Sequence, residues 1–168
     1  VRHDHYTSSL DALEIIQNDT LLFKPGEKFH YSSFGWNIIG ATIETVSGQS
    51  YLNFMEENIF APLKLKSISG VIRDRTFTTL SNGYLVTGEE FSSEDLSYKY
   101  ASGGLMSCSE DLVVFGNKML AEMGSPVSAE LFNTMYLNNG NETNYGIGWN
   151  IGRDRNGHRI FFHTGNMI

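Results

Sequence analysis

Residues 25–36 read Pro25-Gly26-Glu27-Lys28-Phe29-His30-Tyr31-Ser32-Ser33-Phe34-Gly35-Trp36. Proline fixes its own φ and the following glycine permits a positive φ, so the first two residues predict a turn. Directly after this stretch, apolar residues repeat at helical spacing and predict a helix from about Gly35 to Ser47. The sequence therefore predicts that Tyr31-Ser32-Ser33 lies on a turn that leads into a helix.

The other end of the chain favours strands. Residues 161–165 read Phe161-Phe162-His163-Thr164-Gly165, which is typical of a strand that runs into a turn of small residues. The runs 145–151 and 159–163 flank Asn156-Gly157, a pair that favours a β-hairpin turn. We expect one partial domain over residues 1–168, with a mostly helical region over about 8–140 and the start of a C-terminal sheet portion over about 141–168.

Composition narrows the class of protein. The chain has 168 residues, 40% hydrophobic and 18% charged, which are globular values for a single domain. Its net charge of −7 and the lack of a Lys/Arg cluster argue against a nucleic-acid partner. No apolar run approaches the roughly 20 residues that span a bilayer, so no transmembrane segment is expected. Cys108 is the only cysteine, so no intrachain disulfide can form.

Several catalytic motifs are missing from the sequence. The residues three positions before its lysines are Leu21, Pro25, Ala61, Leu63, Leu96 and Phe115, so there is no S-x-x-K motif. No serine lies in G-x-S-x-G, and neither a Walker loop nor H-E-x-x-H is present. His3-Asp4-His5 has no obvious further ligand, so we expect no metal site and no cofactor.

Taken together, several segments of the sequence resemble segments of the serine β-lactamase and penicillin-binding protein superfamily. Residues 25–36 are similar to its P-G-x-x-F-x-Y-S-x-x-G-Y segment, and residues 43–51, 59–63, 101–112, 145–149 and 163–165 follow in matching order. The resemblance is nearest to the class C β-lactamase-like branch, which includes mitochondrial serine β-lactamase-like proteins. It implies an α+β fold of the β-lactamase/DD-peptidase type, with an antiparallel sheet flanked by helices plus a mostly helical region. That fold should be incomplete in this chain, without the S-x-x-K segment.

The resemblance also implies roles for single residues. Tyr31 would be the tyrosine that shuttles a proton between nucleophile and leaving group, and Ser33 stands where many relatives have asparagine. His163, Thr164 and Gly165 stand at the K-T-G box, where substrate binds along the strand. Asn166 would supply a backbone N–H to the oxyanion hole. Taken alone, Tyr31 is better explained as a half-buried tyrosine near a helix start, and His163 as a strand-end histidine.

The sequence thus predicts a serine hydrolase that acts through an acyl-enzyme on an ester, a peptide or a lactam. The replacements Ser33 and His163 favour an esterase or peptidase. The alternative is a non-catalytic module that uses the same cleft to bind a peptide or to assemble. Expected partners are a small-molecule or peptide substrate, and either a second copy or a companion chain that completes the fold. Export or a periplasmic location is suggested by the resemblance only.

Overall fold

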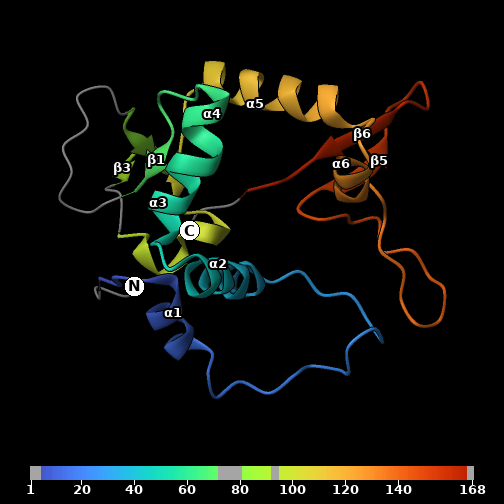
Figure 1. The fold of residues 1–168 in the computed structure, drawn as a ribbon, viewed down its shortest axis with the longest axis horizontal. Coiled ribbons are helices and arrows are strands. Elements are labelled where there is room, and N and C mark those ends of the chain that lie inside the picture. Colours follow the sequence, from blue (N-terminus) through green and yellow to red (C-terminus); the bar gives the residue numbers. More distant parts are fainter. Residues whose placement is uncertain (1–4, 72–80, 92–94, 166–168) are drawn as a thin grey trace. The chain divides into compact units, whose positions relative to one another are not determined.

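The computed structural model describes residues 5–71, 81–91 and 95–165 (Figure 1). His3 and Asp4 of the His3-Asp4-His5 stretch lie outside the described residues, as does Asn166. The chain divides into two compact units, Val1–Asp19 with Ser32–Leu112, and Thr20–Tyr31 with Val113–Ile168. The helical elements are α1 (Ser9–Ala12), η1 (Leu13–Ile15), α2 (Ser33–Ser47), α3 (Tyr51–Met55), η2 (Glu56–Phe60), α4 (Ala61–Leu63), η3 (Ser97–Ser102), α5 (Ser109–Glu122) and α6 (Pro126–Leu131). The strands are β1 (Ser69–Gly70), β2 (Gly83–Tyr84), β3 (Glu90–Phe91), β4 (Leu105–Met106), β5 (Asn150–Arg153) and β6 (Arg159–Phe162).

Helix α2 is the centre of the first unit. It packs against α1 and η3, and its buried face carries Asn37, Gly40 and Ala41. The Asn37 side chain donates a hydrogen bond to the Tyr98 carbonyl at 2.7 Å, which ties α2 to η3. Gly40 lets α2 approach η3 closely, because a Cβ at position 40 would lie only 2.7 Å from the Ala101 Cβ.

The helices near α2 begin and end for local reasons. Ser8 and Ser50 cap α1 and α3 through their hydroxyl oxygens, as their positions in the sequence predict. The apolar spacing after Ser50 predicts a helix that ends near Ile59, with Pro62 closing the unit, but the helical path passes through the π-helical segment η2 and reaches Leu63. Pro62 is tolerated because it lies in the first turn of α4, where a missing N–H costs little.

The strands form small antiparallel pairs. Among the described residues, β1 pairs with β4, β2 with β3, and β5 with β6. The β2–β3 hairpin turns at Thr87-Gly88, a pair that predicts a turn from the sequence. In the longest pair, Ile151 lies opposite Phe161 and Arg153 opposite Arg159, with Gly157 in the turn as predicted.

Aromatic rings hold the second unit together. Phe132 is 3% exposed, and its ring centroid lies 4.7 Å from that of Phe161 and 5.7 Å from that of Trp149. The Arg159 guanidinium donates to the Phe132 carbonyl at 2.6 Å. The sequence favours a short helix over residues 128–136, but α6 ends at Leu131, because the chain beyond Phe132 pairs with residues 141–145 instead. These contacts fix the hairpin β5–β6, whose end carries His163.

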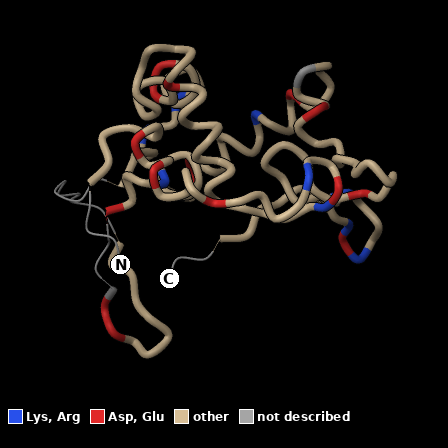
Figure 2. The backbone as a smooth tube through the Cα atoms, turned by 90° about the horizontal axis from the view of Figure 1, so that it is seen from below, with Lys and Arg blue, Asp and Glu red and all other residues tan. Residues whose placement is uncertain are grey.

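Charged residues do not separate into blocks of one sign. Acidic and basic positions are interspersed along the described chain (Figure 2). Within the described residues, no helix combines the length and the apolar character needed to cross a membrane.

Candidate active site

Tyr31 and His163 come together within the second unit. Tyr31 ends the segment Thr20–Tyr31, directly before Ser32, the N-cap of α2. His163 directly follows strand β6. Their ring centroids lie 5.3 Å apart, and Tyr31 is 39% exposed. A phenol and an imidazole from distant parts of the sequence therefore face one another at a surface that a ligand can reach.

A third ring completes this cluster. Tyr145 lies with its centroid 6.0 Å from that of Tyr31 and 5.9 Å from that of His163. Its hydroxyl is 3.0 Å from His163 Nε2. Phe29 also packs against Tyr145, with ring centroids 5.3 Å apart. We refer to Phe29, Tyr31, Tyr145 and His163 as the aromatic site.

A tight turn brings Tyr145 to His163. Residues 145–149 read Y-G-I-G-W, and the Gly146 N–H donates to the Trp149 carbonyl at 2.8 Å. Gly148 has φ 84°, a conformation that favours glycine, and the Leu131 carbonyl occupies the space of a side chain at Gly146. The turn places Tyr145 beside Asn150, which pairs with Phe162, the residue before His163.

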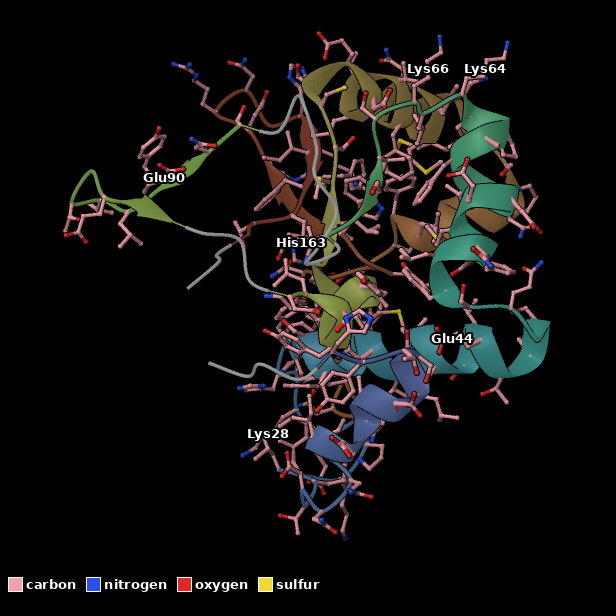
Figure 3. All side chains as sticks on the ribbon, turned by 90° about the vertical axis from the view of Figure 1, so that its left-hand side faces the viewer. Lys28, Glu44, Lys64, Lys66, Glu90 and His163 are labelled. Atoms are coloured by element: carbon pink, nitrogen blue, oxygen red, sulfur yellow. The ribbon has the colours of Figure 1, made fainter. Side chains whose placement is uncertain are left out.

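The His163 side chain has a polar partner at each ring nitrogen. Besides the Tyr145 hydroxyl at Nε2, the Thr164 carbonyl oxygen lies 2.7 Å from Nδ1. Figure 3 shows His163 at the end of its strand. Tyr145 is 8% exposed, whereas His163 and Thr164 are exposed.

The other predicted site residues have different environments. Ser33 is the exposed first residue of α2 and belongs to the first unit, so its approach to His163 stays a prediction. Thr164 and Gly165 continue from His163 as exposed chain, and a side chain at Gly165 would meet nothing within 4 Å. Asn166 lies outside the described residues, so its role in an oxyanion hole also stays a prediction.

Two hollows elsewhere in the second unit are not part of the aromatic site. A polar cavity of about 890 Å³ is lined by Tyr136, Glu142, Arg153 and Arg159, among others. The carboxylate of Glu142 accepts a hydrogen bond from Tyr136 and raises the pKa of that phenol. An apolar cavity of about 480 Å³ lies between α5 and the hairpin β5–β6. Tyr31, Tyr145 and His163 line neither of them.

Tyr145 is the site residue that sequence reasoning missed. The sequence did single out Y-G-I-G-W as a family segment, but its tyrosine was given no role. A signal was present, because two glycines flanking one residue indicate a sharp turn next to a predicted strand. What the sequence could not supply was the strand register that places this turn beside His163.

Comparison with known proteins identifies the class. The fold matches that of a D-stereospecific amidohydrolase from Streptomyces sp., with a TM-score of 0.81 and 23% identity over 99% of this chain and 51% of that one. It also matches the octameric penicillin-binding protein homologue from Pyrococcus abyssi, with a TM-score of 0.72 and 22% identity over 90% of this chain and 37% of that one. The fold is therefore the β-lactamase/DD-peptidase-like fold, with helices and small antiparallel sheets, as predicted.

Sequence comparison then identifies the family. The Beta-lactamase family model matches residues 2–168. The mitochondrial serine β-lactamase-like protein LACTB of Mus musculus is 33% identical over 70% of this chain and 22% of its own length. Penicillin-binding protein 4* of Bacillus subtilis is 25% identical over 92% of this chain and 39% of its own length. The chain belongs to the Beta-lactamase family of the serine hydrolase superfamily, and it spans well under half the length of these two relatives.

Proposed function

We propose that the native protein carrying this chain is a serine hydrolase that acts through an acyl-enzyme, with Tyr31 as the group that moves the proton. The observation that carries the proposal is the 5.3 Å approach of the Tyr31 and His163 rings within one compact unit. Membership of the Beta-lactamase family supports it. The 39% exposure of Tyr31 leaves the phenol within reach of a substrate.

The proposed reaction has two steps. A serine hydroxyl oxygen bonds to the substrate carbonyl carbon, and the bond from that carbon to the leaving oxygen or nitrogen breaks. The serine proton passes through Tyr31 to the leaving group. Water then attacks the acyl carbon, the bond from that carbon to the serine oxygen breaks, and the proton of the water passes through Tyr31 to the serine oxygen. The backbone N–H of Asn166 and that of the nucleophile would stabilise the charged carbonyl oxygen.

The substrate is proposed to be an ester or a peptide rather than a lactam. A hydroxyl at Ser33 reaches less far than the asparagine amide found in many relatives, and it offers one donor where an amide offers two. Thr164 and Gly165 form an exposed edge along which an extended substrate can lie. Solved structures of similar fold include a D-amino acid amidase from Ochrobactrum anthropi SV3, which supports including amides among the assayed substrates.

The nucleophile is proposed to be a serine outside these 168 residues. The sequence offers no S-x-x-K, so the lysine that would assist Tyr31 in the proton transfer is expected in the same outside segment. Treatment of the native protein with a fluorophosphonate, followed by peptide mass spectrometry, should give one serine adduct that maps outside residues 1–168. The isolated chain should give none. A stoichiometric adduct on a serine within residues 1–168 would refute this assignment.

The role of Tyr31 is tested by removing its hydroxyl. Tyr31→Phe in the native protein should lower kcat on a chromogenic ester by roughly 10²–10⁴, the usual contribution of a positioned acid–base group. Tyr84→Phe is a matched control, because Tyr84 is 64% exposed on β2 in the other unit. The control should keep the wild-type rate. Equal steady-state rates for wild type and Tyr31→Phe would exclude Tyr31 from the mechanism.

A further inference from the structure

The hydrogen bonds of His163 define which tautomer its ring adopts. A carbonyl oxygen can only accept, so the 2.7 Å contact with the Thr164 carbonyl requires a hydrogen on Nδ1. In the neutral ring, Nε2 then carries the lone pair and accepts the Tyr145 hydroxyl at 3.0 Å. The Nδ1–H tautomer is therefore set by Tyr145 and Thr164 together.

Tyr145 is well placed to impose this arrangement. It is buried, its N–H donates to the Thr143 hydroxyl at 3.2 Å, and its carbonyl accepts from the Met135 N–H at 2.9 Å. Phe29 and Tyr31 contact its ring. A phenol fixed in this way loses little conformational freedom when its hydroxyl binds His163. The hydrogen bond therefore exists before a substrate arrives.

This arrangement leaves the neutral His163 ring without a free N–H for a substrate. A carboxylate is an acceptor and needs a donor, but the one N–H of the ring is bound to Thr164, and Nε2 is an acceptor itself. Among the residues that the structure describes, no carboxylate forms an ion pair with His163. To bind at Nε2, a substrate carboxylate would have to displace the Tyr145 hydroxyl, and Nε2 would have to take up a proton.

We propose that Tyr145 is a positioning residue that commits both ring nitrogens of His163 to the protein, and that the site therefore selects substrates with a neutral leaving group over those with a carboxylate on it. This inference rests on the proposed function, because it names the substrate class of the same site. In this arrangement His163 lies beside Tyr31 and offers no free N–H to the substrate.

A matched pair of substrates tests the substrate class. The pair is a hippuryl thioester of mercaptoacetate, as the free acid and as its neutral amide, which differ only in the charge on the leaving group. For the native wild-type protein, kcat/KM should be about tenfold or more higher for the amide, the usual effect of one missing hydrogen bond to a charged group. A wild-type preference for the acid would overturn the proposal.

The variant Tyr145→Phe tests the role of the hydroxyl. Nε2 then loses its donor, and the ring is free to present an N–H to a carboxylate. The preference should move about fivefold or more toward the acid, through a lower KM for the acid. Tyr136→Phe is the control, since it also removes a hydroxyl that donates to a neighbour, Glu142, in the same unit. An unchanged preference in Tyr145→Phe would overturn the proposal.

Two further measurements separate this inference from the proposed function. The ¹⁵N spectrum of the histidine rings should show the Nδ1–H tautomer for His163 in wild type, and a shift away from it in Tyr145→Phe. An Nε2–H tautomer in wild type would overturn the arrangement whether or not the protein is active. His163→Lys, which supplies an ammonium donor, should move the preference toward the acid even if Tyr145→Phe does not fold. Turnover of neither thioester by wild type would refute the proposed function and, with it, the substrate choice.

Discussion

Asp95 is a buried carboxylate that joins two distant parts of the first unit. Its side chain is 2% exposed, it accepts from the Ser97 N–H at 2.8 Å, and it lies 2.6 Å from His5 Nδ1. The buried Ser97 hydroxyl accepts in turn from the Tyr6 N–H at 2.8 Å. Burial by itself raises the pKa of Asp95, but the hydrogen bonds from Ser97 and His5 outweigh it and hold the pKa below its usual value.

This lowered pKa gives a pH-dependent stability. Because the pKa is lower in the folded state, the contribution of Asp95 is complete above the unfolded value of roughly 3.9 and is lost as the pH falls through the folded value. Asp95→Asn should lower the free energy of unfolding by about 1–3 kcal/mol at neutral pH, and the difference should shrink toward about pH 3. Urea titrations of the native protein between about pH 6 and pH 3 measure it. The exposed Asp19→Asn is the control, and a difference for Asp95→Asn that does not change with pH would contradict the prediction.

At the residue scale, motif order identified Tyr31 and His163 as candidate site residues, but it did not predict how the side chains around them bind one another. Tyr31 and His163 were both identified from family segments, and the structure places them together. Tyr145 was not identified, because its contact with His163 depends on the register of β5 with β6 and on the turn at Gly148. Neither the strand register nor the contact made by this turn can be predicted from one segment of the sequence alone.

At the element scale, one carboxylate serves the beginnings of two helices. Glu44 lies on α2, and its two oxygens accept from the Leu10 N–H of α1 at 3.2 Å and from the Tyr51 N–H of α3 at 2.9 Å. Figure 3 shows Glu44 where these helices meet. The first N–H groups of a helix lack partners within the helix, so Glu44 supplies partners to both α1 and α3.

Removal of this carboxylate should therefore weaken both helices. Glu44→Ala should lower the free energy of unfolding by about 1–3 kcal/mol, because two backbone N–H groups lose a charged acceptor. Glu44→Gln keeps one acceptor oxygen and should fall between wild type and Glu44→Ala. Thermal and urea unfolding of the native protein measure the order of stability of wild type, Glu44→Gln and Glu44→Ala. Equal stabilities of Glu44→Ala and wild type would show that water replaces the carboxylate at no cost.

Two glycines of α2 should respond oppositely to the same substitution. Alanine favours a helix interior over glycine by about 0.8–1.0 kcal/mol, so Gly35→Ala, which meets nothing within 4 Å, should be neutral or stabilising. At Gly40 the new Cβ would lie 2.7 Å from the Ala101 Cβ and 3.2 Å from the Ser9 hydroxyl. Gly40→Ala should therefore destabilise the protein by about 1–3 kcal/mol. Ala101→Gly should recover part of that loss in urea titrations, and its failure to do so would exclude this clash as the cause.

Helix boundaries show where local signals were sufficient. Ser8, Ser50 and Gly48 were read correctly as helix ends, since caps depend on neighbours in the sequence. Pro62 was read as the end of a helical unit, although it lies within the first turn of α4. The helix expected over residues 128–136 ended early because Met135 pairs with Tyr145, a distant contact that local periodicity does not encode.

At the scale of the whole molecule, contacts divide the chain differently from secondary structure. The sequence predicts a helical region over about 8–140 and a sheet portion over about 141–168, and that division remains a prediction. The compact units instead place Thr20–Tyr31 with Val113–Ile168. The Asn138 N–H donates to the Gly26 carbonyl at 2.9 Å, and Phe29 packs on Tyr145. These long-range contacts leave no periodic signal in the sequence, so the fold class was predictable and the unit boundaries were not.

The contact between Gly26 and Asn138 should therefore determine how often the segment that carries Tyr31 opens away from the rest of its unit. Gly26 has φ +81°, and the Asn138 side chain occupies the space where a Cβ would lie. Gly26→Ala combines backbone strain with this clash, so residues 20–31 should separate more often from the loop around Asn138. Lys28, which is exposed (Figure 3), is then the reporter, because trypsin cleaves after it only when the local chain is open.

Cleavage after Lys28 in the native protein should be about five- to thirtyfold faster in Gly26→Ala, the factor that corresponds to about 1–2 kcal/mol of local stability. Gly88→Ala is the matched control. Gly88 has φ +86° in the β2–β3 turn of the other unit, and a side chain there would meet nothing within 4 Å. It carries the same backbone strain without the contact, so it should leave the cleavage rate at Lys28 unchanged. An equal acceleration in both variants would mean that general destabilisation, and not the anchoring by Asn138, governs how Tyr31 is held.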